Sequence, residues 1–437
     1  MTPQEIVGLF ASRTPQPDWA FHWCRPSDTG KWTHDYHRYP AKFIPQLAER
    51  LFDEFLPEGG THVNDPFMGS GTTIVTAVSR GLRASGTDVN AIAHLVTRVK
   101  ATPIRPDYLE GRTQRLLSEL AFLDAAGSLH VVPGLAPLIP ERHLDRINYW
   151  FPERTRDELG VILRAIGREE DAVARDFFRV AFSHILKNCS RWLQDSTKPT
   201  RDPGKAPAKP LPALRRHLAK MLKGNEAFYR AVPPDVRDRA GELLNIRLGD
   251  ARQQPAADES VDLVVTSSPY VTSYEYADLH QLSTIWLGLA DDLRAYKAGF
   301  IGSARKAHCP ASLRSSIAED IVARLARVDH RIALEVRGFF ADMEQVFDET
   351  HRILRPGGRC CYVIGNTRLR GVDILNAQCF AEAMQAAGLR IHDIIVREIP
   401  LKILPQTRDS KSGRFASNAS ADVQAYPIEF ILVGVKD

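Results

Sequence analysis

The sequence lacks several features by which whole classes of protein are recognised. No Cys-x-x-Cys pair occurs among its six cysteines, which argues against a disulfide framework and favours a reducing compartment. No run approaches about 18 apolar residues, and the N-terminus has no basic stretch followed by an apolar core. We therefore expect a soluble, non-secreted, cytoplasmic protein without a membrane partner. The net charge of +4 is too small to indicate a nucleic-acid partner, so any basic surface must be local.

A recognisable metal site is also lacking. The first 40 residues are irregular and rich in aromatic residues and histidine, and they contain Cys24, His34 and His37. This set is incomplete, and its spacing matches no standard zinc site. We predict no metal, and an N-terminal arm that packs on the rest of the protein.

The most informative feature of the sequence is a glycine turn near residue 70. A short apolar run at 61–65 ends at an aspartate, turns through Gly-Ser-Gly and opens a helix, an arrangement that brings backbone close to a nucleotide-like ligand. The turn residues are Asp65, Pro66, Phe67, Gly69, Ser70, Gly71 and Thr72. Ile74 stands where a dinucleotide motif has its third glycine, which counts against a pyrophosphate ligand. A cofactor without phosphates, such as S-adenosylmethionine, remains compatible with the turn.

Two more aspartates end predicted strands. Asp88 closes the strand at 84–89, where a ribose-binding carboxylate belongs in such a fold, and the alternative is an ordinary helix-flanking aspartate. Asp250 follows Gly249 at the end of a third strand, and the alternative for it is a solvent-facing turn residue.

The middle of the chain, 101–245, differs in texture because helical stretches alternate with proline-rich connections. Ten Lys or Arg and two Asp lie from Lys187 to Lys223, among several prolines. Such a run is either a solvated, partly disordered face or a contact for nucleic-acid phosphates. The candidate phosphate contacts are Lys198, Arg201, Lys205, Lys209, Arg215 and Arg216.

Strand–helix alternation resumes at 244–250, which indicates an α/β protein. The run at 261–266 is a fully apolar strand of the buried parallel type, and it leads directly into Ser267, Ser268, Pro269 and Tyr270. A helix at 337–354 follows, and the last strands, 389–399 and 428–435, are expected to pair as an antiparallel edge. Since ligands bind at the carboxyl ends of parallel strands, the two loops that follow 61–65 and 261–266 are the candidate site.

These two loops carry a family resemblance. Residues 65–72 resemble the cofactor loop of the amino-group DNA methyltransferases, and Ser-Ser-Pro-Tyr at 267–270 resembles their Asp/Asn/Ser-Pro-Pro-Tyr catalytic loop. Residues 37–43 resemble the segment that lies near the methionine end of S-adenosylmethionine in this family, which implies Lys42 and Phe43 as cofactor contacts. Residues 352–358 and 363–366 resemble later scaffold motifs. The resemblance spares 101–245.

The resemblance implies a Rossmann-like methyltransferase fold with a mostly parallel seven-stranded sheet, an antiparallel edge hairpin and a mainly helical insertion. Residues 1–100 would form an N-terminal arm and the cofactor half, 101–245 a DNA target-recognition region, and 246–437 the catalytic half with a helical excursion at 290–335. S-adenosyl-L-methionine is the implied cofactor, and Asp250 would bind its adenine amino group. Double-stranded DNA is the implied partner, in a prokaryotic cytosol or nucleoid.

The resemblance also implies a mechanism. A base amine is a poor nucleophile, and in the family the catalytic loop accepts its hydrogens and aims its lone pair at the methyl group of the cofactor. Carried over, Ser267 and the Ser268 carbonyl are the acceptors, Pro269 stiffens the turn, and Tyr270 stacks on a base that has left the helix. Ser268 departs from the proline usual at the second position, so the loop loses a rigid φ.

Serine at position 267 resembles cytosine-N4 members more than adenine-N6 members. Three alternatives remain: an adenine-N6 DNA methyltransferase, an RNA guanine-N2 methyltransferase, and a DNA reader that binds the cofactor without transferring methyl groups. Methylation at carbon 5 of cytosine is rejected, because no cysteine follows a proline as that chemistry requires in the family pattern. A cognate restriction endonuclease is a hypothesis that this chain cannot reveal.

Overall fold

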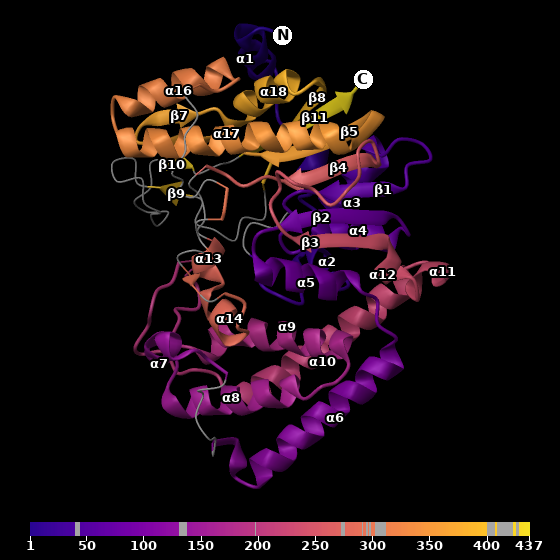
Figure 1. Ribbon diagram of the computed structural model, residues 1–437, viewed down its shortest axis with the longest axis vertical. Coiled ribbons are helices and arrows are strands. Elements are labelled where there is room, and N and C mark those ends of the chain that lie inside the picture. Colours follow the sequence, from indigo (N-terminus) through magenta and orange to yellow (C-terminus); the bar gives the residue numbers. More distant parts are fainter. Residues whose placement is uncertain are drawn as a thin grey trace.

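The computed structural model (Figure 1) describes residues 1–39, 44–130, 138–196, 198–271, 276–290, 312–399 and 428–437. It also describes the positions 292, 293, 296, 299–301, 407, 408, 423 and 424. Lys42 and Phe43 lie outside these ranges. No helix within them is long and apolar enough to cross a membrane.

A seven-stranded sheet forms the upper half of the molecule in Figure 1. Its strand order is β3-β2-β1-β4-β5-β11-β8. In that order the strands are Leu244–Leu248, Arg83–Asp88, His62–Asp65, Val261–Ser267, Leu354–Ile364, Ile428–Lys436 and Leu389–Glu398. The first five are parallel, and β11 runs antiparallel to both of its neighbours. The expected mostly parallel sheet with an antiparallel edge is confirmed, and the fold is Rossmann-like.

Helices cover both faces of the sheet because its central strands are apolar on both sides. Alternate residues of β4 divide between two cores, with Val264 in one and Leu263 and Val265 in the other. The first core packs under α1 (Pro3–Ala11), α16 (Ser316–Ala326), α17 (His330–Ile353) and α18 (Asn376–Ala386). The second packs under α3 (Pro45–Phe55) and α4 (Thr72–Ser79).

Helix α17 begins earlier than the expected residue 337. The side chain of Asp329 accepts a hydrogen bond from the backbone N–H of Ile332 at 3.1 Å and caps the helix N-terminus. Apolar Ala333 and Val336 continue the buried face through this added first turn.

A helical lobe lies below the sheet in Figure 1 and has its own hydrophobic core. Its helices are α6 (Pro106–Ala125), α7 (Leu144–Trp150), α8 (Glu153–Gly167), α9 (Ala172–Cys189) and α10 (Pro210–Ala231). Helix α14 (Gln281–Trp286), from beyond β4, packs into the same core through Leu282, Ile285 and Trp286. Helix α5 (Ala91–Ala101) contributes Ile92 and Val96 and thereby joins the lobe to the sheet.

The described part of the basic run, on either side of position 197, is folded into a compact connection between α9 and α10. Trp192 forms a backbone bridge with Arg201 and stacks on Trp150, with ring centroids 5.1 Å apart. The Arg201 guanidinium lies 4.7 Å from the centroid of the Tyr149 ring. The structure here is therefore ordered by aromatic packing, whereas composition alone also allowed a partly disordered face.

Candidate functional site

The carboxyl ends of the parallel strands meet at one edge of the sheet, and the candidate site lies there. The turn 66–71 follows β1, Asp88 ends β2, and Ser267 ends β4 and is followed by 268–270. The strand order places β1 between β2 and β4, so all three segments are neighbours.

The glycine turn has the left-handed backbone that glycine supplies. Gly69 has φ +48° and Gly71, which precedes α4, has φ +79°. A Cβ on Gly71 would lie 2.7 Å from Cγ2 of Thr97, so no side chain fits there. Helix α5 holds the turn from below: Thr97 Oγ1 donates to the Gly69 carbonyl at 2.9 Å, and Lys100 Nζ, from a fully buried side chain, donates to the Ser70 carbonyl at 3.0 Å. Sequence reasoning missed Thr97 and Lys100.

Asp65 is buried at the junction of the two loops. Its Oδ1 accepts hydrogen bonds from the Phe67 N–H at 3.1 Å and from Thr266 Oγ1 at 2.7 Å. Burial raises the pKa of Asp65 to about 7 in spite of these donors. Thr266 is the residue just before Ser267, so this carboxylate joins the glycine turn directly to the predicted catalytic loop.

Asp88 supports the glycine turn from β2. Its Oδ2 accepts the Gly69 N–H at 2.9 Å, and its Oδ1 accepts the Asn90 N–H at 2.8 Å. Burial raises the pKa of Asp88 to about 6. The adjoining Pro66 carbonyl accepts a hydrogen bond from Thr87 Oγ1 at 2.9 Å. Each carboxylate oxygen of Asp88 retains a second lone pair, so a ribose role stays a prediction.

Asp250 is paired with an arginine. Arg252 donates from Nε to Oδ1 of Asp250 at 2.9 Å and from Nη2 to Oδ2 at 2.5 Å, and its Nη1 reaches Asp342 at 2.8 Å. The predicted contact of Asp250 with an adenine amino group would have to share oxygens with this guanidinium.

The predicted catalytic loop is fastened to the next strand. The Ser268 N–H donates to the carbonyl of Val363 on β5 at 3.2 Å, and its Oγ donates to the same carbonyl at 3.3 Å. Proline at position 268 has no N–H and could not form the first bond. The loop therefore lacks the rigid φ of a proline at this position, but the hydrogen bonds of Ser268 fasten it to β5.

Tyr270 is oriented by a residue that sequence reasoning missed. Its hydroxyl donates to Oε1 of Glu429 at 2.8 Å, and Oε2 of Glu429 pairs with Nη1 of Arg397 at 3.1 Å. Arg397 is buried, and its Nε donates to the Trp19 carbonyl at 3.0 Å. Because β11 is antiparallel, Glu429 at its start reaches the edge where the parallel strands end. The only signal in the sequence is a carboxylate inside the apolar run 428–435.

The segment before α3 lies against the glycine turn. A Cβ on Gly69 would lie 3.3 Å from the Tyr39 ring, and that ring lies 5.1 Å from the ring of His280. His37 bonds Ser183 Oγ of α9 through Nε2 at 2.8 Å. Residues 37–39 therefore touch both the turn and the helical lobe.

The six predicted phosphate contacts fall into two groups. Lys198, Lys209, Arg215 and Arg216 are exposed. Arg201 and Lys205 are half-buried and bind backbone carbonyls: Arg201 Nε donates to Tyr149 at 3.0 Å, and Lys205 Nζ donates to Trp192 at 2.7 Å. DNA contact by these residues stays a prediction.

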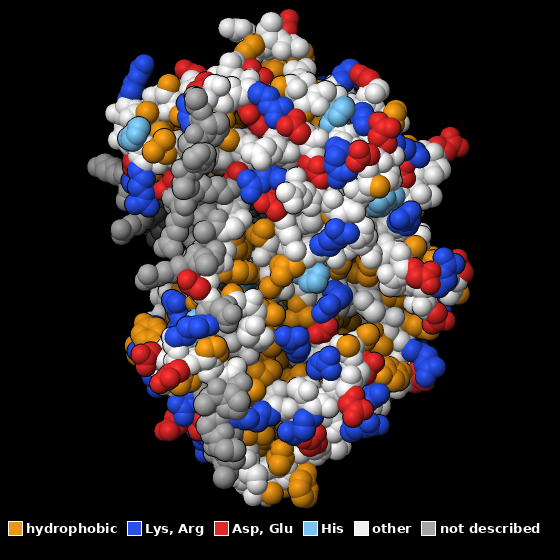
Figure 2. Space-filling model, viewed as in Figure 1, with side chains coloured by type: hydrophobic (Ala, Val, Ile, Leu, Met, Phe, Trp, Pro, Cys, Tyr) orange, Lys and Arg blue, Asp and Glu red, His pale blue; other side chains and the backbone are white. Residues whose placement is uncertain are grey.

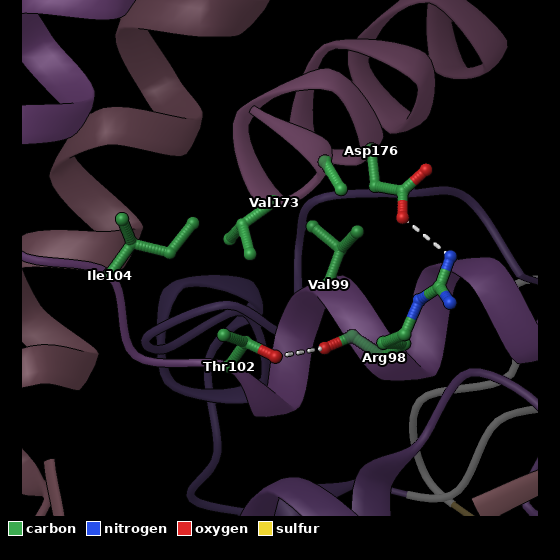
Figure 3. Close-up of a pocket in the computed structure, with 7 residues that line it drawn as sticks. Arg98, Val99, Thr102, Ile104, Val173 and Asp176 are labelled. Atoms are coloured by element: carbon green, nitrogen blue, oxygen red, sulfur yellow. Dashed lines mark hydrogen bonds and ion pairs between the residues drawn. The ribbon is translucent and has the colours of Figure 1, made fainter. Parts of the chain in front are cut away.

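Two adjoining cavities share no lining residue with the candidate site. One, of about 160 Å³, is lined by residues of α5 and α9 that include Arg98, Val99 and Val173 (Figure 3). Its neighbour, of about 300 Å³, shares Thr102 and Ile104 with it. Figure 2 shows hydrophobic side chains on the surface between the sheet and the helical lobe. The cavities lie at the last turn of α5, and because α5 starts at the carboxyl end of β2, its end points to the opposite edge of the sheet.

The turn has a buried polar group for a ligand to satisfy. Ser70 is only 3% exposed, yet its Oγ has no hydrogen-bond partner among the described residues. It lies between the two left-handed glycines and near two carboxylates of raised pKa, the buried Asp65 and the half-buried Asp88, and such carboxylates favour a cationic ligand. These residues fit S-adenosylmethionine, which is cationic at sulfur. No group of three or more potential metal ligands is found among the described residues.

Comparison with known proteins finds similarity to DNA methyltransferases. A family model described as DNA methylase, of the N6/N4 type, matches residues 11–96. The type II methyltransferase M.MvaI of Kocuria varians is 26% identical over 412 residues, covering 90% of this chain and 89% of that protein. M.BsoBI of Geobacillus stearothermophilus is 22% identical, covering 84% of this chain and 81% of that protein. A putative DNA modification methylase of Thermus thermophilus, solved with S-adenosyl-L-methionine, is 17% identical over 43% of this chain and 51% of its own, with a TM-score of 0.21.

We expect Asp65→Asn to stabilise the protein while weakening its ligand binding. A carboxyl whose native pKa is raised costs stability above that pKa, and the cost disappears as pH falls toward the unfolded value. The asparagine Oδ1 can still accept from Phe67 and Thr266. At pH 8 the variant should therefore unfold a few degrees higher than the unaltered protein, with a smaller difference at pH 6. Affinity for S-adenosylmethionine, measured by calorimetry, should fall about tenfold or more.

A matched control is Asp373→Asn, which removes an exposed carboxylate paired with Arg368. This control should change neither the thermal midpoint nor the affinity for S-adenosylmethionine. Lower stability of Asp65→Asn at both pH values would contradict the assignment.

Buried histidines predict an acid-sensitive lobe. Burial lowers the pKa of His217, whose ring stacks on His184 at 3.7 Å, to about 4. A histidine with a depressed native pKa costs stability as pH falls below its unfolded value near 6.5, and the loss ends near the native value. His217→Gln should flatten the fall of the thermal midpoint between pH 6.5 and 5, whereas exposed His330→Gln should not. Equal slopes in calorimetric scans would refute this prediction.

Proposed function

The chain belongs to the amino-group DNA methyltransferase family, and from this premise we propose that it methylates N4 of cytosine at a specific sequence in double-stranded DNA. Its methyl donor is S-adenosyl-L-methionine. The observation that supports the proposal most directly is the bond of 2.7 Å between Thr266 and Asp65, because it joins the glycine turn to the Ser-Ser-Pro-Tyr loop. One site can therefore serve a cofactor and a base together.

The residues that would hold the cofactor are those of the glycine turn and its supports. Ser70 Oγ offers an unsatisfied hydroxyl, and Asp65 and Asp88 offer carboxylates already fixed by backbone donors. When bound, the cofactor supplies an electrophilic methyl group on a sulfonium. Thr97 and Lys100 keep the turn in place from α5, so the site needs little rearrangement to bind it.

The residues of the catalytic loop would receive the base. Ser267 accepts one hydrogen of the exocyclic amine and the Ser268 carbonyl accepts the other, which directs the nitrogen lone pair away from the loop. Tyr270 stacks on the base, which must leave the duplex at a cost of a few kcal/mol. Orientation of the two reactants supplies most of the rate, and no covalent enzyme intermediate is required.

Serine at position 267 is the basis for proposing cytosine over adenine. The bond from the Ser268 N–H to Val363 supports an active enzyme over a cofactor-binding reader, because the loop is held without the usual proline. We further propose a cytosolic location and, as a hypothesis, a cognate restriction endonuclease.

The proposal is tested by incubating the protein with labelled cofactor and DNA, followed by mass spectrometry of the nucleosides. N4-methylcytosine is the expected product, and Ser267→Ala should reduce the rate by about a hundredfold or more while leaving cofactor binding intact. N6-methyladenine would overturn the base assignment alone. Absence of any methylated base, or methylation of transfer RNA in preference to duplex DNA, would overturn the function. Normal turnover by Ser267→Ala would show that the loop is wrongly assigned.

Glu429→Gln is expected to impair catalysis through Tyr270. The glutamine keeps an acceptor for the hydroxyl but loses the charge that holds Arg397, so the ring loses its fixed position. The kcat should fall roughly 10- to 100-fold, with a small change in KM for the cofactor. Tyr270→Phe should cause a similar loss, and the double variant should be no worse than either single one, because both changes release the same ring from its fixed position.

The matched control is Glu319→Gln, which breaks the ion pair of 2.6 Å with Arg337 between α16 and α17. It should lower thermal stability without changing kcat. Additive losses in the double variant would refute the coupling of Glu429 to Tyr270.

A further inference from the structure

Three cationic side chains from separate segments converge beside the candidate site. Arg38 lies in the segment before α3, Lys187 in the last turn of α9, and Lys205 in the connection between α9 and α10. Burial lowers the pKa of Lys187 to about 8, and the positive charges of Arg38 and Lys205 contribute to that shift. Burial likewise lowers the pKa of Lys205, and Arg38 adds to the shift. We call these three residues the cation cluster.

Among the described residues, no carboxylate forms an ion pair with any of the three members of the cluster. The acids that act on it electrostatically are Asp35, Asp195 and Asp202. Of these, Asp35 is paired with Lys220, and Asp202 accepts the Gly204 N–H at 3.0 Å. Lys187 and Lys205 are half-buried and Arg38 is exposed, and like charges held close together are stabilised when an anion joins them.

The cluster is fixed by neutral acceptors. Lys205 Nζ donates to the Lys187 and Trp192 carbonyls at 2.9 and 2.7 Å and to Gln194 Oε1 at 3.4 Å, which occupies its three N–H groups. Lys187 Nζ donates to the Ser196 carbonyl at 2.9 Å, and Arg38 Nη1 donates to Asn188 Oδ1 at 3.0 Å. Arg38 and Lys187 therefore keep unused donors, while Lys205 contributes charge.

The place of the cluster indicates its ligand. Arg38 is adjacent in the chain to Tyr39, whose ring lies against Gly69 of the cofactor turn. Arg38 also follows His37, which bonds the helical lobe through Ser183. The cluster thus lies where the lobe meets the catalytic edge. An arginine and a lysine with unused donors suit a phosphate, since guanidinium matches its oxygens in pairs.

We propose that Arg38, Lys187 and Lys205 form a binding site for a backbone phosphate of the DNA strand that carries the target base. This inference rests on the proposed function. A phosphate contact next to the site would fix the strand while its base leaves the duplex, because phosphate contacts set register without reading sequence. In this proposal Arg38 and Lys187 donate hydrogen bonds to the phosphate, whereas Lys205 attracts it by its positive charge alone.

The first test is the salt dependence of DNA binding by Arg38→Gln and Lys187→Met, measured by fluorescence anisotropy over a range of potassium chloride. Each variant loses one phosphate-binding charge, so the slope of log Kd against log salt should become shallower by about 1. Cofactor affinity should stay unchanged. The control is Arg331→Gln, which removes the same charge from α17, where the arginine side chain is 84% exposed. Its slope should equal that of the unaltered protein.

The second test begins with the unaltered protein, whose result does not depend on how the variants fold, and then compares it with Arg38→Gln. In DNA carrying the recognition sequence, single phosphates near the target base are replaced by neutral methylphosphonates. One position should lose affinity with the unaltered protein, and Arg38→Gln should lose nothing further at that position. Loss at no position, combined with displacement of DNA by inorganic phosphate at matched ionic strength, would mean that the cluster takes a free anion, and the inference would be overturned.

The two levels of proposal fail differently. If the unaltered protein neither binds nor methylates duplex DNA, the proposed function fails. If it methylates DNA while Arg38→Gln and Lys187→Met keep the full salt slope, only the cation cluster inference fails.

Discussion

The buried carboxylate of Asp65 is the constraint on which the rest of the site depends. Asp65 ends β1. Its carboxylate accepts hydrogen bonds from the N–H of Phe67 in the glycine turn and from the hydroxyl of Thr266 near the end of β4. Burial that raises its pKa to about 7 is tolerated because its donors come from both loops at once. A carboxylate that costs stability and yet holds two loops together has the character of a functional group, since a purely structural junction would use a neutral side chain.

The antiparallel direction of β11 is a second constraint on the candidate site. In a wholly parallel sheet, the start of a strand at this position would lie at the far edge, and Glu429 could not reach Tyr270. Because β11 is antiparallel to β5 and β8, Glu429 stands at the catalytic edge together with Arg397, which is near the end of β8. The edge hairpin therefore contributes to the orientation of Tyr270 as well as forming the edge of the sheet.

What could be predicted from the sequence was local. The glycine turn and the Ser-Ser-Pro-Tyr loop are each contiguous, so strand, turn and helix signals were enough to locate them and the α/β sheet. The supports Thr97, Lys100 and Glu429 were missed because each acts across a long separation in the chain, 159 residues for Tyr270 and Glu429. The ordered connection around Trp192 was not foreseen, because a basic and proline-rich composition carries no record of the Trp150 ring that packs on it.

Helix α5 links the helical lobe to the glycine turn mechanically. One of its faces carries Thr97 and Lys100, which hold the glycine turn, and another carries Ile92 and Val96, which are part of the core of the helical lobe. A rigid helix that is packed on both sides transmits displacement, because close-packed interiors do not deform continuously. Through α5, the core of the helical lobe is therefore in direct mechanical contact with the glycine turn. Segment 37–39 provides a second connection between the same two parts, through His37 to Ser183 and Tyr39 to Gly69. The lobe is therefore joined to the sheet at more than one point.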